Sequence, residues 1–495
     1  MAEAALKAQR NPAGMPEPVA RAEVDAVNRR EQRSLYEKRR KIYPRLARGA
    51  FRRLKWLVMA LTLAVYYLSP WLRWERGPNA PDQAILIDFP GRRFYFFFIE
   101  IWPQEVYYLT GLLILAAIGL FLVTSVAGRV WCGYTCPQTV WTDLFIAIER
   151  LIEGDRSARI RLDRAPWSAA KLLRKACKHL LWLAVAVATG GAWVFYFADA
   201  PTLAVDLIHF QAPAVSYLFI GIMTFTTYTL GGIAREQVCI YMCPWPRIQA
   251  AMLDEDTLTV TYRRDRGEPR GPYRRGDSWH GRGNCIDCNQ CVAVCPMGID
   301  IRDGLQLECI SCALCIDACD GVMDRIGLPR GLIAYDTDDN IERRQRGQAP
   351  RFRPIRPRTL AYAGIIAVVG IVMLAALLTR DSVDLNVLRD RNPLFTRLAD
   401  GSIRNGYTVK ILNKRHDESV FDLGVEGLQP SDIKLIGAEP DGIRVAPDSL
   451  KSFRVLLTVP AASAPAENAP IRFVLREGAS GIVAGHASQF LGPKS

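Results

Sequence analysis

Eight of the thirteen cysteines in this 495-residue chain fall within 35 residues, from Cys285 to Cys319. They form two runs, each with the spacing Cys-x2-Cys-x2-Cys-x3-Cys. In bacterial ferredoxins with this spacing, three cysteines of one run and the last cysteine of the other hold one [4Fe–4S] cluster. The pattern therefore predicts two clusters. Set 1 would be Cys285, Cys288, Cys291 and Cys319, and set 2 would be Cys295, Cys309, Cys312 and Cys315.

Zinc is the competing interpretation, because Cys-x2-Cys pairs also suit a tetrahedral zinc site. Two complete runs of four cysteines exceed what zinc needs, so the spacing favours clusters. The runs differ in one respect, since Pro296 follows the first run and Asp320 stands at the matching place in the second. This difference removes no ligand.

Four further cysteines occur in two matching Cys-x3-Cys-Pro motifs, in the text GRVWCGYTCPQTVWTDLF and EQVCIYMCPWPRIQAAML. Proline suits the first position of a helix, so the second cysteine of each motif is expected near a helix N-terminus, where a thiol pKa falls. Four such thiolates form a soft site, which selects Cu(I), zinc or another iron–sulfur cluster. The alternative is that these cysteines only pack in a helical hairpin. Set 3 comprises Cys132, Cys136, Cys239 and Cys243.

Apolar windows of the length needed to cross a membrane surround these motifs. About 20 residues of helix span the hydrocarbon core, and five windows nearly free of charge approach that length. The sequence therefore predicts a multi-pass α-helical membrane protein with five spans. The windows are Leu54–Leu72, Val106–Ala127, His179–Phe197, Ala214–Ile233 and Leu360–Leu378.

The net charge of +13 is distributed unevenly about these windows. Lys and Arg gather before the first window, between the second and third, and between the fourth and fifth. Basic loops face the cytoplasm, so the N-terminus and the cysteine runs are expected inside the membrane-bounded cytoplasm and the C-terminus outside it. This distribution predicts membrane lipid, and not nucleic acid, as the partner of the positive charge. Disulfides are unexpected in the reducing cytoplasm.

The amino-acid composition and hydropathy pattern change along the chain, and these changes predict five parts. Residues 1–53 read as a solvated basic tail held near anionic headgroups, residues 54–256 as a four-span membrane domain and residues 359–379 as the fifth span. Residues 257–358 form an inserted α+β domain of the two-cluster bacterial ferredoxin type, in which residues 257–284 read as loop. Alternating apolar and polar runs in residues 380–495 predict an all-β sandwich.

The chain resembles the FixG/CcoG/RdxA-type accessory proteins of cbb-type cytochrome oxidase, a membrane polyferredoxin family. The resemblance rests on WCGYTCPQTVW, on CIYMCPWPRIQAAMLDEDTLTVTY, on the RGEPRG loop, and on the ferredoxin runs ending in DACDGVMDRIGLPRGLI. It implies an inner-membrane iron–sulfur protein that acts in oxidase assembly with a role in copper handling, and an immunoglobulin-like domain outside the membrane. It also implies that the four cysteines of set 3 take part in copper binding or reduction.

Three functions follow as hypotheses. The first is an oxidoreductase of the cupric reductase type, in which two [4Fe–4S] clusters, supplied by an unknown electron donor, reduce Cu(II) held by set 3 to Cu(I). The second is a non-catalytic assembly factor whose outer domain holds oxidase subunits or other assembly factors. The third is a quinol-linked electron donor.

Overall fold

The computed structural model describes residues 19–28, 40–77, 80–273, 278–428, 432–437, 442–465, 467–478 and 482–492. Most of the predicted basic tail, residues 1–18 and 29–39, lies outside the described residues. The chain forms two compact units. The first unit contains the chain up to Leu72 and the segment Ala84–Met373. The second unit contains the segment Arg73–Gln83 and the chain from Leu374 onward.

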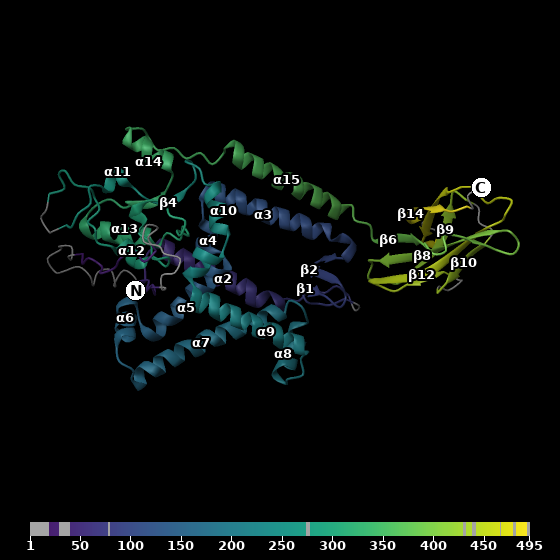
Figure 1. The fold of residues 1–495 in the computed structure, drawn as a ribbon, viewed down its shortest axis with the longest axis horizontal. Coiled ribbons are helices and arrows are strands. Elements are labelled where there is room, and N and C mark those ends of the chain that lie inside the picture. The colour runs from purple at the N-terminus through teal and green to yellow at the C-terminus, as the bar shows by residue number, and fades with distance from the viewer. Residues whose placement is uncertain are drawn as a thin grey trace. The chain divides into compact units, whose positions relative to one another are not determined.

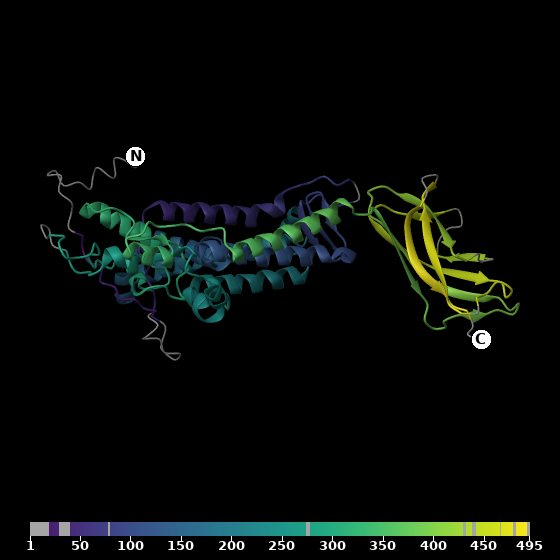
Figure 2. The same ribbon diagram turned by 90° about the horizontal axis from the view of Figure 1, so that it is seen from above.

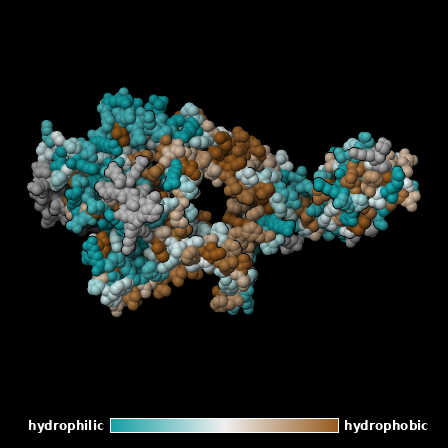
Figure 3. Space-filling model, in the orientation of Figure 1, coloured by the Kyte–Doolittle hydropathy of each residue, from teal (hydrophilic) through white to brown (hydrophobic). Residues whose placement is uncertain are grey.

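Four helices in the described chain are long and apolar enough to cross a membrane. Two of them, α3 and α15, lie side by side, with Phe121 and Tyr362 in ring contact (Figures 1 and 2). Figure 3 shows apolar side chains gathered over this pair. The four candidate spans are Pro103–Ala127, which contains α3 (Tyr107–Ala127); Ala169–Val194, which is α7; Ala214–Ala234, formed by α9 (Ala214–Thr226) and the π-helical segment η4 (Thr227–Ala234); and Pro357–Leu378, which is α15.

The first predicted window forms helix α2 (Ala50–Leu68), followed by the short helix η2 (Ser69–Trp71). Arg52, Arg53 and Lys55 lie in its first two turns, and with 19 residues α2 has a shorter uncharged stretch than the 26-residue α7, which also begins with basic residues. A fifth span therefore stays a prediction. Helix α7 also differs from the predicted window, since it begins ten residues before His179. Its added turns carry lysines, such as Lys175, which pairs with Glu153 at 3.0 Å.

Shorter elements connect the spans and carry the cysteines. A small antiparallel sheet of β1 (Ile85–Asp88), β2 (Arg93–Phe96) and β3 (Ile99–Ile101) leads to η3 (Pro103–Glu105). The shorter helices are α4 (Val130–Tyr134), α5 (Pro137–Glu153), α6 (Arg156–Arg164), α8 (Ala200–Ile208), the π-helical η5 (Val238–Met242) and α10 (Trp245–Met252).

The inserted domain has one antiparallel strand pair and several short helices. The prediction of loop for residues 257–284 is wrong at Thr259–Tyr262, because this segment is strand β4 and pairs with β5 (Ile333–Asp336). Val260 and Tyr262 are buried in the same apolar core as the cysteines. The helices are α11 (Arg264–Gly267), α12 (Gln290–Val294), η6 (Ile301–Asp303), α13 (Leu314–Ile326) and α14 (Asp338–Gln345).

The C-terminal unit is built of β-sheets, as the alternating pattern predicts. Strand β8 buries every second side chain over most of its length, and its Tyr407 meets Phe473 of the other sheet with ring centroids 5.0 Å apart. One sheet has the order β10-β12-β8-β6 with β7 paired to β8, and the other has the order β11-β9-β13-β14. The strands are β6 (Val383–Arg389), β7 (Thr396–Arg397), β8 (Ile403–Asn413), β9 (Ser419–Glu426), β10 (Asp432–Ile436), β11 (Ile443–Val445), β12 (Ser449–Val459), β13 (Ala469–Arg476) and β14 (Ile482–Phe490).

Candidate metal centres

Two cavities in the inserted domain are lined by the two predicted cysteine sets. One cavity has all four cysteines of set 1 in its wall. The other has all four cysteines of set 2 in its wall, together with Cys291 of set 1. Each cavity thus receives thiols from both runs, which is the exchange of fourth ligands that the ferredoxin spacing predicts. Four thiols around one cavity suit a [4Fe–4S] cluster.

The two ligand loops have matching backbone conformations. In the first run Asp287 and Asn289 have φ values of 48° and 55°, and in the second run Ser311 and Ala313 have 53° and 60°. Residues in this left-handed backbone conformation turn the chain around each set of cysteines, just before α12 and α13 begin. The conformation is unfavourable for a residue such as Ala313, so the surrounding loop must impose it. The shared strain indicates that both loops are shaped for the same kind of group.

Backbone N–H groups of the turns point at the thiols. The N–H of Gln290 hydrogen-bonds Cys288, and the N–H of Ser311 hydrogen-bonds Cys309. Burial, reinforced by the neighbouring thiol of Cys312, nevertheless raises the pKa of Cys295 to about 12. Metal binding must therefore displace protons from these thiols. All thirteen cysteines lie in the described part of the chain and carry free thiols.

The structure brings the two Cys-x3-Cys-Pro motifs together. Cys132 lies in α4, Cys136 is the N-cap residue of α5, Cys239 lies in η5, and Cys243 directly precedes Pro244, the N-cap residue of α10. Burial, together with thiols of the other motif, raises the pKa of Cys132 to about 11 and that of Cys239 to about 12. The four thiols of set 3 therefore lie close enough to influence one another.

The sulfur atoms of set 3 are too far apart for three of them to bind one ion as they stand. All four belong to the described residues, and no three of their sulfur atoms lie within 4.8 Å of one another. A single ion with metal–sulfur bonds of about 2.3 Å holds its thiolates within about 4.6 Å. Binding one ion through three or four of these cysteines therefore requires the motifs to approach.

Set 3 lies directly against the loop that carries set 2. A Cβ atom on Gly133 would be 2.6 Å from the carbonyl oxygen of Ile310 and 3.0 Å from Cα of Cys312. The hydroxyl of Tyr134 donates to the carbonyl of Cys312 at 3.3 Å. Cys132 belongs to the same buried apolar core as the cysteines of the inserted domain. The membrane-side motif and the second ligand loop are thus one packed assembly.

Asp317, between Cys315 and Cys319, was not singled out in the sequence. Its carboxylate accepts hydrogen bonds from the backbone N–H groups of Phe51 at 3.2 Å and Arg52 at 2.7 Å. These groups lie in the first turn of α2, whose own N-cap residue, Gly49, provides no side-chain cap. An acid between two cysteines carries no sequence pattern that indicates such a distant contact. Asp317 therefore ties α13 to the start of α2 as a cap supplied from elsewhere in the chain.

We expect Asp317→Ala to destabilise the first turn of α2 by about 1–2 kcal/mol, the usual value of a helix cap. The measurement is amide hydrogen exchange of the peptide containing Phe51 and Arg52, which should become faster. Asp324→Ala on the same helix is the matched control, since Asp324 forms an exposed pair with Arg330, and such pairs contribute little. Equal exchange in both variants would refute the capping role.

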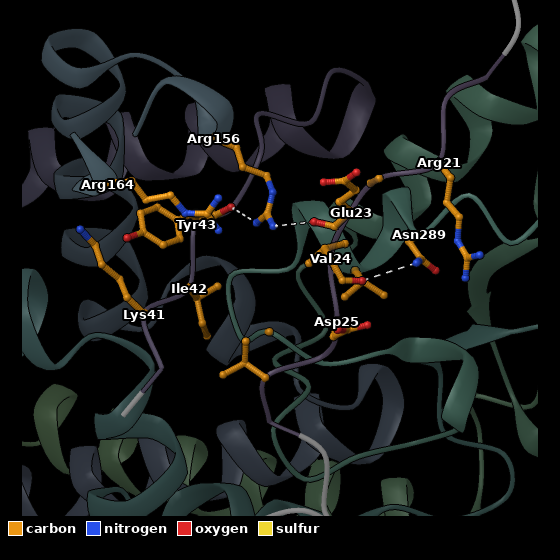
Figure 4. Close-up of a pocket in the computed structure, with 14 residues that line it drawn as sticks. Arg21, Glu23, Val24, Asp25, Lys41, Ile42, Tyr43, Arg156, Arg164 and Asn289 are labelled. Atoms are coloured by element: carbon orange, nitrogen blue, oxygen red, sulfur yellow. Dashed lines mark hydrogen bonds between the residues drawn. The ribbon is translucent and has the colours of Figure 1, made fainter. Parts of the chain in front are cut away.

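The prediction of a solvated tail is wrong for residues 19–28, because this segment packs on the first ligand loop. The backbone N–H of Ala22 donates to the carbonyl of Cys288 at 2.9 Å. Figure 4 shows Asn289 donating to the carbonyl of Val24, at the edge of a pocket that the segment shares with α6. Backbone hydrogen bonding, which composition does not reveal, is the reason that these residues cover set 1.

A buried ion pair fixes the helix that follows Cys136. Arg52 of α2 donates to both oxygens of Asp143 on α5, at 2.9 and 2.7 Å. Burial by itself disfavours the charged carboxylate, but Lys55 and Arg52 together hold the pKa of Asp143 below its usual range. Loss of one partner from such a pair leaves a buried charge uncompensated. The pair therefore holds α5, and with it Cys136, against α2.

Family models match three parts of the chain. Residues 109–153 match a 4Fe-4S binding domain, residues 234–338 match a 4Fe-4S dicluster domain, and residues 373–493 match the IG-like fold at the C-terminal of FixG. The first two matches include one Cys-x3-Cys-Pro motif each, and the dicluster match also includes sets 1 and 2.

Whole-length relatives are also similar to this chain. The nitrogen fixation protein FixG of Rhizobium meliloti is 54% identical over 89% of this chain and 91% of its own length. Proteins RdxA and RdxB of Cereibacter sphaeroides are 54% and 52% identical over 88% and 93% of this chain and over 92% and 98% of their own lengths. A solved FixG-related protein from Vibrio parahaemolyticus covers 22% of this chain and 96% of its own, at 26% identity and a TM-score of 0.20.

Proposed function

The chain belongs to the FixG family of iron–sulfur electron-transfer proteins, and from this premise we propose that it reduces Cu(II) to Cu(I) for assembly of a cbb-type cytochrome oxidase. The observation that carries the proposal is the contact between the set 2 loop and set 3. Gly133, inside the first Cys-x3-Cys-Pro motif, packs against the backbone of Cys312, inside set 2.

Sets 1 and 2 are the proposed ligands of two [4Fe–4S] clusters. The two cavities support this assignment, since each has one complete set in its wall. When bound, such clusters supply electrons one at a time. The protein's part is to bury the thiols, to direct backbone N–H groups at Cys288, Cys295 and Cys309, and to hold the second loop against α4.

Set 3 is the proposed site of the copper ion, which is the substrate. Thiolates prefer Cu(I) to the harder Cu(II), so a thiol site favours the product of a one-electron reduction. The four thiols lie close enough to influence one another, as groups that bind the same ion must. Copper held here would lie beside the loop of Cys309 and Cys312.

The proposed placement has five spans, with α2 as the first, in a bacterial inner membrane. The N-terminal part and the inserted domain would be cytoplasmic and the C-terminal β domain periplasmic. The distribution of Lys and Arg supports this orientation, because the segments before α2, between α3 and α7, and between α9 and α15 carry most of them. The first turns of α2 would then lie at the cytoplasmic boundary, where Arg53 is exposed to headgroups.

The test is anaerobic mixing of Cu(II) with protein that has been reduced by dithionite and freed of excess reductant. We expect each cluster to be reoxidised by one electron and one Cu(I) to form per electron, followed with a Cu(I)-specific chelator and by the loss of the reduced-cluster signal in electron paramagnetic resonance. Reduced clusters that persist in the presence of Cu(II) would contradict the proposal. Iron, sulfide and copper counts on the same sample separate clusters from zinc.

A further inference from the structure

Arg129 is a buried cation that contacts both the set 2 loop and set 3. It lies between α3 and α4, and only 3% of its surface is exposed. Its Nη1 donates to the carbonyl of Leu307, two residues before Cys309. Its Nε donates to Oε1 of Gln249 at 3.3 Å, and the same oxygen accepts from Sγ of Cys132 at 3.1 Å. One guanidinium therefore joins the two sulfur sites through short contacts.

Among the residues that the structure describes, no Asp or Glu oxygen lies within ion-pair distance, 4.0 Å, of the Arg129 guanidinium. Burying a cation without an anion carries a large desolvation cost. The ionisable groups on which its charge acts include the thiols of Cys132, Cys239 and Cys309. These thiols are therefore the groups placed to balance the charge of Arg129 once metal binding has removed their protons.

Packing fixes these groups at constant separation. Arg129 is the N-cap residue of α4, and the same short helix places Gly133 and Tyr134 on the backbone of the second ligand loop. Gln249 is fully buried and is held on its other side by a hydrogen bond from its Nε2 to Thr124 at 3.1 Å. Movement of Arg129 relative to either sulfur site would break these contacts.

We propose that Arg129 is a positioning residue shared by set 2 and set 3, which holds the loop before Cys309 and supplies the positive charge for both groups of thiolates. The inference rests on the proposed function for the identity of the groups bound there. Negative charge on either sulfur site is stabilised by the same guanidinium. An electron that leaves one site for the other therefore stays beside the same cation, which keeps the electrostatic cost of the transfer low.

The test compares Arg129→Met and Arg129→Lys in the full-length protein with its clusters bound. Two quantities are measured: Cu(I) affinity, by competition with a Cu(I) chelator, and the midpoint potentials of the two cluster signals. We expect Arg129→Met to weaken Cu(I) binding about 100-fold, as loss of a charge at about 6 Å in a medium of dielectric about 20 implies. The same variant should lower the potential of the set 2 signal and leave that of set 1 unchanged.

Arg129→Lys should restore part of both effects, because it keeps the charge but loses the planar fork. Arg247→Met is the matched control, since Arg247 is exposed on α10 beside the second motif. If Arg129→Met changes only one of the two quantities, or neither, the shared role is refuted. If Arg129→Met loses iron, Gln249→Met provides the second variant. This variant should weaken Cu(I) binding and leave the midpoint potentials of both cluster signals at their wild-type values.

Failure of the copper proposal itself has a different signature. Wild-type protein would then bind no Cu(I) in the competition, whereas the potentials would still report on Arg129. A shift of the set 2 potential in that case would leave Arg129 as a residue of set 2 alone and would overturn its sharing with set 3.

Discussion

Replacing the four cysteines of set 3 by alanine should abolish Cu(I) formation while both cluster signals remain. Changes to groups that merely support metal ligands cost about 10–100-fold in affinity or activity, so removal of the ligands should reduce the rate by more than about 100-fold. The substitution is Cys132→Ala, Cys136→Ala, Cys239→Ala and Cys243→Ala together, and the measurement is the stopped-flow reoxidation of reduced clusters by Cu(II).

The pairs within set 3 make this prediction sharper. If both motifs bind one ion, Cys132→Ala with Cys136→Ala should be as damaging as all four changes, because ligands that act as a unit are not additive. If each motif binds its own ion, each double variant should keep about half of the Cu(I) yield. The thiols themselves can reduce Cu(II) by forming a disulfide, so disulfides are counted after the reaction.

A suitable control is Cys177→Ala, which removes the one cysteine outside the three sets. Cys177 lies in α7, and its loss should leave both the rate and the iron content unchanged. An unaltered Cu(I) yield in the quadruple variant would show that set 3 is not the copper site.

Substitutions among the cluster cysteines should remove one cluster at a time, and in a crossed order. Cys319→Ala and Cys285→Ala should abolish the same resonance signal although they lie in different runs, and Cys295→Ala and Cys309→Ala should abolish the other. Each change removes one of four thiolates, and a partly ligated cluster is prone to loss, so the iron content should fall by about half, from eight atoms toward four.

The measurement is iron and sulfide per protein, together with low-temperature electron paramagnetic resonance of the reduced sample. Pairing within each run, in which Cys295→Ala and Cys285→Ala remove the same signal, would contradict the crossed assignment. Only loss of the set 2 signal should stop Cu(II) from reoxidising the protein directly, because the set 2 loop is the one in contact with α4.

The grouping of the cysteines in the inserted domain could be predicted from the sequence because its information is local. The proposed ligands of sets 1 and 2 lie within 35 residues, and cysteine spacing alone restricts how such a short chain can surround a cluster. The apolar windows near α3, α9 and α15 are equally local, since helix length and composition decide whether a segment can span a membrane. Cys-Pro likewise indicated the N-cap position of Cys136.

Where charge and distant contacts decide the structure, the sequence was a weaker guide. It placed the start of α7 too late, because the lysines that lengthen this helix are held by carboxylates on other helices. It also assigned β4 to a loop, since a four-residue strand between arginine-rich segments becomes recognisable only when β5 pairs with it.

The amino-acid sequence by itself predicted which cysteines of the inserted domain line the same cavity, and it determined which segments are apolar enough for a membrane. Only the tertiary structure decided that Gly133 touches the Cys312 loop, that Asp317 caps α2, and that Arg129 reaches both sulfur sites. The reason is physical. Spacing constrains residues joined by a short length of chain, whereas contacts between residues over a hundred positions apart depend on how the whole core packs.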